Sequence, residues 1–343
     1  MRAAVLHGKD DLRVEELPEP SPGPGDVKVH VSGCGICGSD LHLVRGAGLR
    51  RSGPPHPLVL GHEFAGTVVA VGSEVVRHQV GATVAVRPTV SCGVCGACTS
   101  GRENVCRALR FFGVTPPLDG GMSEYAVVPE GNAHALPAGL DVVSAALAEP
   151  LAVGHHAVRR GAARPEDTVV VYGGGPIGIS IVVGLRAAGI DTVLLVEPSP
   201  VRRDAAAALG GTREAWDPVH TDVRAEVLRR TGGRGADVVF ETSGHPTAFT
   251  DAQRVAARQA RIVIVAAYEQ PVAFDPYFLL STEQSLTAAL AYTPAEFDEV
   301  LTLMAAGAYP LDGWVKSVAL EDVLLGGFDA VDQQRATKVL VRP

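Results

Sequence analysis

The chain has 343 residues, of which 46% are hydrophobic, and this is enough apolar sequence for two sizeable cores. Its formal net charge is −8, which argues against a nucleic-acid partner and against docking on anionic membranes. The N-terminal residues lack the long apolar core of a signal peptide, so a cytoplasmic location is expected.

The first part of the chain has the pattern of a β-rich domain. Alternating apolar and polar residues over 1–32 predict an opening hairpin, a turn stiffened by four prolines, and a strand at 27–31. Short β-rich runs separated by glycines from 59 to 86 predict a small, partly closed β-structure. Short strands resume at 123–128, and a helix is expected from about Val142.

Four cysteines form the most specific pattern of the sequence: Cys92, Cys95, Cys98 and Cys106, with the spacing C-x2-C-x2-C-x7-C. Four thiolates at such spacing are typical of one tetrahedral zinc, and they leave no open position, so this zinc would be structural. Buried or disulfide-bonded cysteines are the alternative, but reduced cysteines at this spacing favour metal. The lobe that carries them spans roughly residues 90–110.

A second set of metal-ligating residue types lies in the same part of the chain. Cys37 lies in CGICGSDLH, His62 and Glu63 lie in GHE, and Glu149 lies in AEPL. One thiolate, one imidazole and one carboxylate oxygen would leave the fourth position of a tetrahedral zinc open. Taken singly these residues are weak evidence. Cys34 and Cys37 could also be a redox C-x-x-C pair, although no thioredoxin-like context follows.

After Glu149, strand-like runs alternate with helical stretches, which predicts a doubly wound parallel sheet. The apolar run 168–185 has the length of a membrane span, but glycines and a proline in its middle would break a spanning helix. The predicted strands are 168–172, 192–196, 237–240 and 262–265, the predicted helices are 176–188, 200–209 and 223–230, and a helix at 294–306 and a strand at 338–341 follow.

A glycine-rich turn predicts a dinucleotide site. The run Gly173-Gly174-Gly175-Pro176-Ile177-Gly178 fits G-x-G-x-x-G, follows a predicted strand and opens a helix. The first glycine permits the tight turn, the second lets the backbone approach a pyrophosphate, and the third allows close packing of helix and strand. The helix N-terminus adds unpaired amides and a partial positive charge.

Glu197 predicts the choice of cofactor. It ends the next strand, about twenty residues after the turn, where a carboxylate accepts hydrogen bonds from the adenosine ribose. It would repel the extra phosphate of NADP, so NAD is expected and NADP is less favoured. Arg202 and Arg203 could bind that phosphate, although a solvated helix face is the commoner role for such residues. Arg202 is kept as a candidate cofactor-binding residue.

In this order the motifs resemble those of medium-chain, zinc-dependent alcohol and polyol dehydrogenases, over essentially the whole chain. The segment AEPLAVGHHAV is most similar to the sorbitol, threonine and 2,3-butanediol dehydrogenase branch. In ordinary alcohol dehydrogenases a cysteine stands where Glu149 stands here. The resemblance implies Cys37 and His62 as catalytic zinc ligands. Glu63 and Glu149 are then either ligands or the carboxylate that holds the zinc-bound water, and the sequence does not assign these two roles.

The resemblance also implies the architecture. It predicts a GroES-like, β-rich catalytic domain at 1–150 with its structural zinc lobe, a Rossmann dinucleotide-binding domain at 151–290, and a C-terminal segment, 291–343, that returns to the catalytic domain. Homodimers or homotetramers are expected.

The implied function is a zinc-dependent oxidoreductase with two zinc ions per chain. It would transfer hydride between NAD and a secondary alcohol in a diol, polyol or related hydroxy compound, giving the ketone or aldehyde. Zinc would act as a Lewis acid, and Ser39 and His42 would relay the released proton to solvent. The stretch 43–56, with Arg45, Arg50 and Arg51, is predicted to form part of the substrate wall.

Two alternatives remain at this point. One is a zinc-independent NADPH reductase of the same superfamily, and the other is a non-catalytic nucleotide-binding protein. Two zinc ions per chain would fit the dehydrogenase, one would fit a structural relic, and none would fit the zinc-free reductase.

Overall fold

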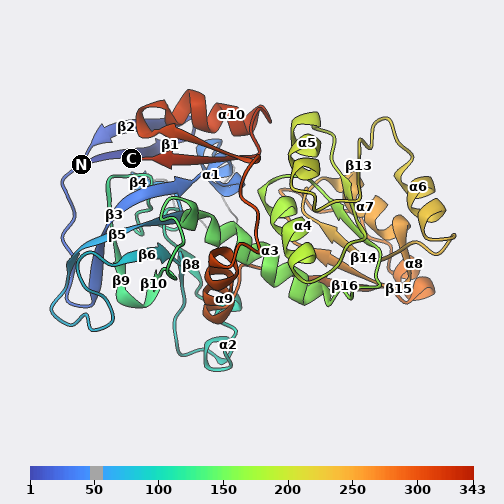
Figure 1. Ribbon diagram of the computed structural model, residues 1–343, viewed down its shortest axis with the longest axis horizontal. Coiled ribbons are helices and arrows are strands. Elements are labelled where there is room, and N and C mark those ends of the chain that lie inside the picture. Colours follow the sequence, from blue (N-terminus) through green and yellow to red (C-terminus); the bar gives the residue numbers. More distant parts are fainter. Residues whose placement is uncertain (47–56) are drawn as a thin grey trace. The chain divides into compact units, whose positions relative to one another are not determined.

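The computed structural model describes residues 1–46 and 57–343, which form two compact units (Figure 1). Unit 1 consists of residues 1–149, 293–308 and 315–343. Unit 2 consists of residues 150–292 and 309–314. The chain therefore begins unit 1, builds unit 2 and returns to unit 1, while the short segment 309–314 belongs with unit 2.

Unit 1 is built around a mixed sheet with β3 (Asp26–Gly35) in its middle. Val27, Val29 and Val31 of β3 are buried in the core of unit 1, as the period of two along a strand requires. The predicted strand at 27–31 is thus confirmed, and it continues to Gly35. Across the sheet the strands follow the order β10 (Ala133–Ala135), β6 (Thr83–Val86), β5 (Glu63–Val71), β3, β18 (Lys338–Arg342) and β17 (Val315–Ala319). A further strand, β9 (Tyr125–Pro129), also pairs with β3.

The predicted N-terminal hairpin is confirmed, because β1 and β2 pair in antiparallel fashion. The expected helix near Val142 begins slightly later, with a 3-10 turn at Ser144–Leu147 that leads into α3. The remaining strands of unit 1 are β1 (Arg2–Gly8), β2 (Asp11–Glu16), β4 (Leu58–Val59), β7 (Thr89–Val90) and β8 (Arg110–Phe111), and its other helices are α1 (Gly38–Val44), α2 (Gly96–Thr99), α9 (Pro294–Ala305) and α10 (Asp329–Asp332).

The strand register at the end of β3 brings distant parts of the sequence together. Gly35 of β3 pairs with Glu63 at the start of β5 on one side. On the other side it pairs with Leu340 of β18, which is the red C-terminal strand among the blue strands in Figure 1. Side chains from the segment after β3, from the start of β5 and from the start of β18 therefore converge.

Unit 2 contains a parallel sheet in the order β13-β12-β11-β14-β15-β16. The strand order reverses between β11 and β14, which makes this sheet doubly wound, as predicted. The four residues of β11 are buried, which explains the uninterrupted apolar run that predicted it. The strands are β11 (Val169–Tyr172), β12 (Val193–Val196), β13 (Glu214–Trp216), β14 (Ala236–Glu241), β15 (Ala256–Ile264) and β16 (Ser285–Ala288).

The predicted helices of unit 2 match observed helices to within one residue at each end. The predicted strands also match, except that β15 is much longer than the predicted 262–265, because it begins directly at the end of α7. Among the described residues, no helix combines the length and the apolar character that crossing a membrane would need. The helices are α3 (Ala148–Gly161), which begins at the boundary of the two units, α4 (Pro176–Ala187), α5 (Pro200–Ala208), α6 (Val223–Arg230), α7 (Pro246–Val255) and α8 (Pro276–Thr282).

Candidate metal centres and nucleotide site

Cys37, His62 and Glu63 come together in unit 1, with their candidate ligand atoms all within 4.8 Å of one another. Cys37 precedes α1, His62 directly precedes β5, and Glu63 is the first residue of β5. The close approach needs the glycine at position 35, because a Cβ there would lie 1.9 Å from Glu63 Oε2. The group combines one sulfur, one imidazole and one oxygen ligand, a set that suits zinc.

Asp40 orients this group, a role that sequence reasoning missed. Its side chain is fully buried, and its Oδ2 accepts a hydrogen bond of 2.9 Å from the backbone N–H of Cys37. Its Oδ1 lies 3.6 Å from Nδ1 of His62, while Ser39 Oγ lies 3.4 Å from Nε2 of the same ring. A carboxylate behind an imidazole is the usual support of a zinc-ligating histidine.

The electrostatics of the group favour a cation. Burial lowers the pKa of His62, but the charges of Asp40 and Cys37 outweigh burial, and the net pKa is well above its usual value. Oδ1 of Asp40 and Nδ1 of His62 are buried, face each other at 3.6 Å and form no other polar contact among the described residues. Anionic neighbours and unsatisfied polar atoms around three ligand groups fit a bound Zn²⁺.

Lys338 completes this centre from the other end of the chain, and sequence reasoning did not find it. Its side chain is fully buried, its ammonium forms an ion pair with Glu63, and its Nζ donates a 2.8 Å hydrogen bond to the carbonyl of Ile36. Burial lowers the pKa of Lys338, but Glu63 first and then Cys37 and Glu149 outweigh burial, and the net pKa is raised above its ordinary value. The available signal was a lysine directly before the apolar run Val339–Val341.

The structure places the other predicted catalytic residues nearby in unit 1. Glu149 is 5% exposed in the first turn of α3 and lies near enough to Lys338 to raise its pKa. The three residues within 4.8 Å of one another do not include it, so its role stays a prediction. Ser39 and His42 are half-buried in α1.

The predicted substrate wall is described only in part. Residues 47–56, with Arg50 and Arg51, lie outside the described residues. Arg45 forms an ion pair with Asp332, at the end of α10, and therefore already has a carboxylate partner within unit 1.

The four-cysteine lobe has the geometry of a closed metal site. Ligand atoms of Cys92, Cys95, Cys98 and Cys106 all lie within 4.8 Å of one another. Cys95 Sγ lies 3.5 Å from Cys98 Sγ and 3.9 Å from Cys106 Sγ. Backbone N–H groups of Cys98 and Arg107 lower the pKa of Cys95 to about 6, which favours the thiolate that a metal needs.

None of the six cysteines, all of which lie among the described residues, forms a disulfide. The disulfide alternative for the lobe therefore does not hold. Cys34 is fully buried in β3 as a free thiol, and burial raises its pKa well above the ordinary value. A buried, protonated thiol does not support the redox pair with Cys37.

In unit 2, the glycine-rich turn has the conformation that its sequence predicts. Gly173 adopts φ = +99°, and a Cβ there would lie 2.6 Å from Thr242 Oγ1. A Cβ at Gly178 would lie 1.8 Å from the carbonyl oxygen of Gly173, so helix and strand pack closely. Gly175 borders open space, with only Arg202 Nη1 at 4.0 Å, and α4 starts at Pro176. This leaves room for a pyrophosphate at the start of the helix.

Glu197 lies against this turn and is 2% exposed. Its Oε2 accepts a 2.6 Å hydrogen bond from the N–H of Gly174, and its Oε1 accepts one of 2.7 Å from Ser199. Arg202 lies 4.0 Å from Glu197 Oε2, and Arg203 donates to the carbonyl of Glu197. Both arginine side chains are less than a quarter exposed, so the expectation of a solvated helix face is wrong.

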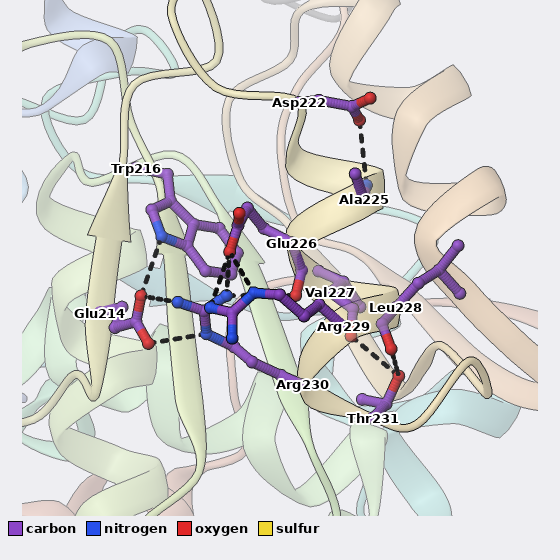
Figure 2. A network of polar contacts seen from close by, with 10 residues as sticks. All are labelled: Glu214, Trp216, Asp222, Ala225, Glu226, Val227, Leu228, Arg229, Arg230 and Thr231. Atoms are coloured by element: carbon purple, nitrogen blue, oxygen red, sulfur yellow. Dashed lines mark hydrogen bonds and ion pairs between the residues drawn. The ribbon is translucent and has the colours of Figure 1, made fainter.

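A polar network fixes β13, which pairs with the strand that ends just before Glu197 (Figure 2). Arg230 of α6 donates to Glu214 Oε1 of β13 at 2.6 Å, and its guanidinium lies 4.7 Å from the ring centroid of Trp216. Trp216 Nε1 donates to Glu214 Oε2 at 3.2 Å, and Figure 2 draws this hydrogen bond as a dashed line. Because the carbonyl of Trp216 accepts the backbone N–H of Glu197 at 2.9 Å, this network also fixes the position of Glu197.

Comparison with known proteins places this chain among alcohol dehydrogenases. Residues 23–138 match the family model of the alcohol dehydrogenase GroES-like domain, and residues 176–306 match that of zinc-binding dehydrogenases. The chain is 37% identical to a (R,R)-butanediol dehydrogenase of Bacillus subtilis over 100% of both chains. It is also 37% identical to a sorbitol dehydrogenase of Bacillus subtilis, over 77% of this chain and 74% of that one.

A solved structure agrees with these matches. The crystal structure of 2R,3R-butanediol dehydrogenase from Bacillus subtilis superimposes with a TM-score of 0.90 at 36% identity, covering 100% of this chain and 99% of that chain. The predicted fold class, a Rossmann sheet with a GroES-like domain, is confirmed.

Proposed function

We propose that this chain, which belongs to the medium-chain, zinc-dependent alcohol and polyol dehydrogenase family, oxidises a secondary alcohol within a diol or polyol and reduces NAD. The family predicted from the sequence is confirmed, and the protein is an oxidoreductase that acts on alcohols. The specific substrate, the direction of the reaction and the roles of single residues are our proposals.

One observation carries the proposal: buried His62 and Glu63 and half-buried Cys37 form a group with the ligand chemistry of an open zinc site. A second group, of four cysteines, has the chemistry of a closed site. Two metal groups of different kinds favour the dehydrogenase over the zinc-free reductase and the structural relic. We expect two zinc ions per chain, one in each group.

The residues of unit 1 would hold the metal and move the proton. When bound, zinc supplies a Lewis acid that favours deprotonation of the alcohol, and NAD accepts the hydride. Cys37 and His62 would be ligands, and either Glu63 or Glu149 would provide the carboxylate. Asp40 keeps the imidazole of His62 oriented. Ser39 and His42 would pass the proton of the alcohol to solvent, as the resemblance implies.

Unit 2 would bind the cofactor through its glycine-rich turn. The pyrophosphate is expected at the first turn of α4, against Gly175, Pro176, Ile177 and the neighbouring guanidinium of Arg202. Glu197 beside the turn favours NAD, because its carboxylate would repel the 2′-phosphate of NADP.

The relatives support a diol or polyol as substrate. The two curated relatives named above carry the names of a butanediol dehydrogenase and a sorbitol dehydrogenase, and both compounds have neighbouring hydroxyl groups. Glu149, at the position where ordinary alcohol dehydrogenases have a cysteine, sets this chain with the same branch. The alcohol carbon would be oxidised to the ketone or aldehyde.

We also infer a homo-oligomer in the cytoplasm. Strand β16 is at the edge of the sheet of unit 2, and the nearby Leu280, Leu286 and Leu290 are 39–73% exposed. An uncharged edge strand can pair with the same strand of a second copy about a two-fold axis. Six free cysteines favour a reducing compartment.

The proposed activity is tested by measuring NADH formation from NAD with the purified, zinc-loaded protein. The panel contains vicinal diols, polyols, simple secondary alcohols and L-threonine. Faster turnover of one diol or polyol than of the simple alcohols supports the proposal. Equal turnover of all secondary alcohols, or turnover of L-threonine alone, contradicts the proposed substrate. A protein that holds no zinc and reduces quinones or alkenes with NADPH contradicts the proposed reaction.

A further inference from the structure

Glu241 is a fully buried carboxylate at the end of β14, and the sequence pattern did not single it out. Its Oε1 accepts hydrogen bonds from the N–H and the hydroxyl of Ser243 at 2.8 and 2.5 Å, and from the N–H of Gly244 at 3.1 Å. Its Oε2 accepts one from the hydroxyl of Tyr268 at 2.5 Å. The donors are neutral amides and hydroxyls, which is enough to hold a buried carboxylate in place.

Tyr268 anchors the segment that follows β15. Its ring packs edge-on against Phe249 of α7, with ring centroids 6.2 Å apart, and its hydroxyl reaches Glu241. The N–H of Val265 donates to the carbonyl of Glu241 at 2.9 Å. Val265 and Tyr268, the first and last residues of segment 265–268, are therefore both hydrogen-bonded to Glu241 at the end of β14. Burial and the hydrogen bond to Glu241 raise the pKa of Tyr268, so its hydroxyl stays a donor.

The same end of β14 also contacts the glycine-rich turn. Thr242 Oγ1 donates to the carbonyl of Tyr172 at 2.8 Å, and a Cβ on Gly173 would lie 3.1 Å from the backbone nitrogen of Ser243. A Cβ on Gly244 would lie 3.1 Å from the carbonyl oxygen of Ala267. The segment after β14 therefore contacts both the segment after β11 and the segment after β15, at the edge of the sheet where the strands end.

The sheet order gives the direction in which a bound dinucleotide extends. The pyrophosphate site lies at the end of β11, and Glu197 places the adenosine on the β12 side. Dinucleotides cross the carboxyl edge of such a sheet at the point where the strand order reverses, which here lies between β11 and β14. The nicotinamide half therefore extends over the segments that follow β14 and β15.

We propose that Glu241 and Tyr268 are a pair of positioning residues that hold segment 265–268 against the nicotinamide half of NAD. The inference rests on the proposed function, because it assumes that NAD is the cofactor. Without the phenolic hydroxyl, Oε2 of Glu241 keeps only the 3.3 Å contact with the N–H of Gly244, and the segment loses its distal attachment. The segment would then become ordered only when the cofactor binds. Because ordering costs free energy, the affinity for the cofactor would fall.

The test compares two ligands that differ only in the nicotinamide. Tyr268→Phe removes one hydroxyl, and Tyr277→Phe, at a tyrosine that is 75% exposed on α8, is the matched control. The dissociation constants of NADH and ADP-ribose are measured by calorimetry on the full, zinc-loaded chain. We expect Tyr268→Phe to weaken NADH about tenfold while ADP-ribose changes less than about twofold. Tyr277→Phe should change neither.

The outcomes separate this inference from the proposed function. Equal weakening of both ligands by Tyr268→Phe, or no weakening of NADH, overturns the positioning role while NAD binding stands. A wild-type protein that binds neither ligand contradicts the proposed cofactor, and the positioning role falls with it. Glu241→Gln keeps the shape and removes the charge, and it should show the same selective loss of NADH affinity. The unfolding temperature of each variant shows whether unit 2 is intact.

Discussion

Replacing Lys338 by methionine should strongly destabilise unit 1. Lysine and methionine have similar volume, so the change removes the ammonium without opening a large cavity. It leaves the carboxylate of Glu63, which is 1% exposed, without its counter-charge, and it leaves the carbonyl of Ile36 without its donor. Stability is affected because a buried charge is costly unless it is paired.

The expected cost follows from the burial of both partners. Removing one partner of a buried ion pair costs about 3–5 kcal/mol. At about 1.4 kcal/mol per factor of ten, such a loss corresponds to amide hydrogen exchange that is roughly 150- to 5,000-fold faster in the protected strands of unit 1. Because the pKa of Lys338 in the folded chain is raised above the ordinary value of lysine, chiefly by Glu63 acting against burial, its contribution is fully present at any pH below that ordinary value. It is lost only as the pH rises through the folded-state value.

Hydrogen exchange is the suitable assay because both tryptophans, Trp216 and Trp314, belong to unit 2 and cannot report on unit 1. Peptides from β3 and β18 would be compared with peptides from β11 as an internal control. Removing zinc should increase the cost of Lys338→Met, since a bound cation partly compensates Glu63. The double variant with Glu63→Gln should recover most of the loss.

A change in exchange of less than tenfold in β3 would refute this reasoning, as would a double variant no more stable than Lys338→Met. Either result would mean that water or rearrangement satisfies Glu63 without the lysine. Faster exchange in β11 to the same degree would mean that the substitution acts on the whole chain rather than on unit 1.

Three further substitutions test the metal and cofactor assignments. Cys37→Ser should lower turnover at least about 100-fold with little change in unfolding temperature, and normal turnover would contradict its role as a ligand. Cys98→Ser should remove one of the two zinc equivalents, as measured by metal analysis, and lower the unfolding temperature, as measured by calorimetry. Unchanged zinc content and an unchanged unfolding temperature would count against a structural zinc. Glu197→Ala should raise the ratio of kcat/KM for NADP to that for NAD about tenfold, and an unchanged ratio would mean that the carboxylate does not face the ribose.

Local patterns were sufficient to predict the elements of unit 2. Strands such as β11 are uninterrupted apolar runs because both of their faces are covered, and Gly173 and Gly178 occupy positions where a Cβ would clash. The spacing of the four lobe cysteines was equally informative, because the ligands lie close together in sequence. In these regions the interactions that determine the structure are between residues near one another in the chain.

The contributions of Lys338, Asp40 and Glu241 could not be predicted in this way. Lys338 contacts Ile36 across 302 positions, and only the pairing of β18 with β3 brings them together. Asp40 lies within a recognised motif, but its function depends on the position of His62, which precedes a strand distant from α1 in the sequence. Glu241 resembles any acidic residue at the end of a strand until Tyr268 is seen to reach it.

The pairing of β18 with β3 has a consequence for how the protein is made. Lys338 is synthesised about 300 residues after Cys37 and after all of unit 2, yet its side chain completes the centre to which Cys37 belongs. Most of unit 2 is continuous in sequence and is synthesised before that point. On the ribosome, unit 2 can therefore fold first, while unit 1 holds an unpaired Glu63 until β18 emerges.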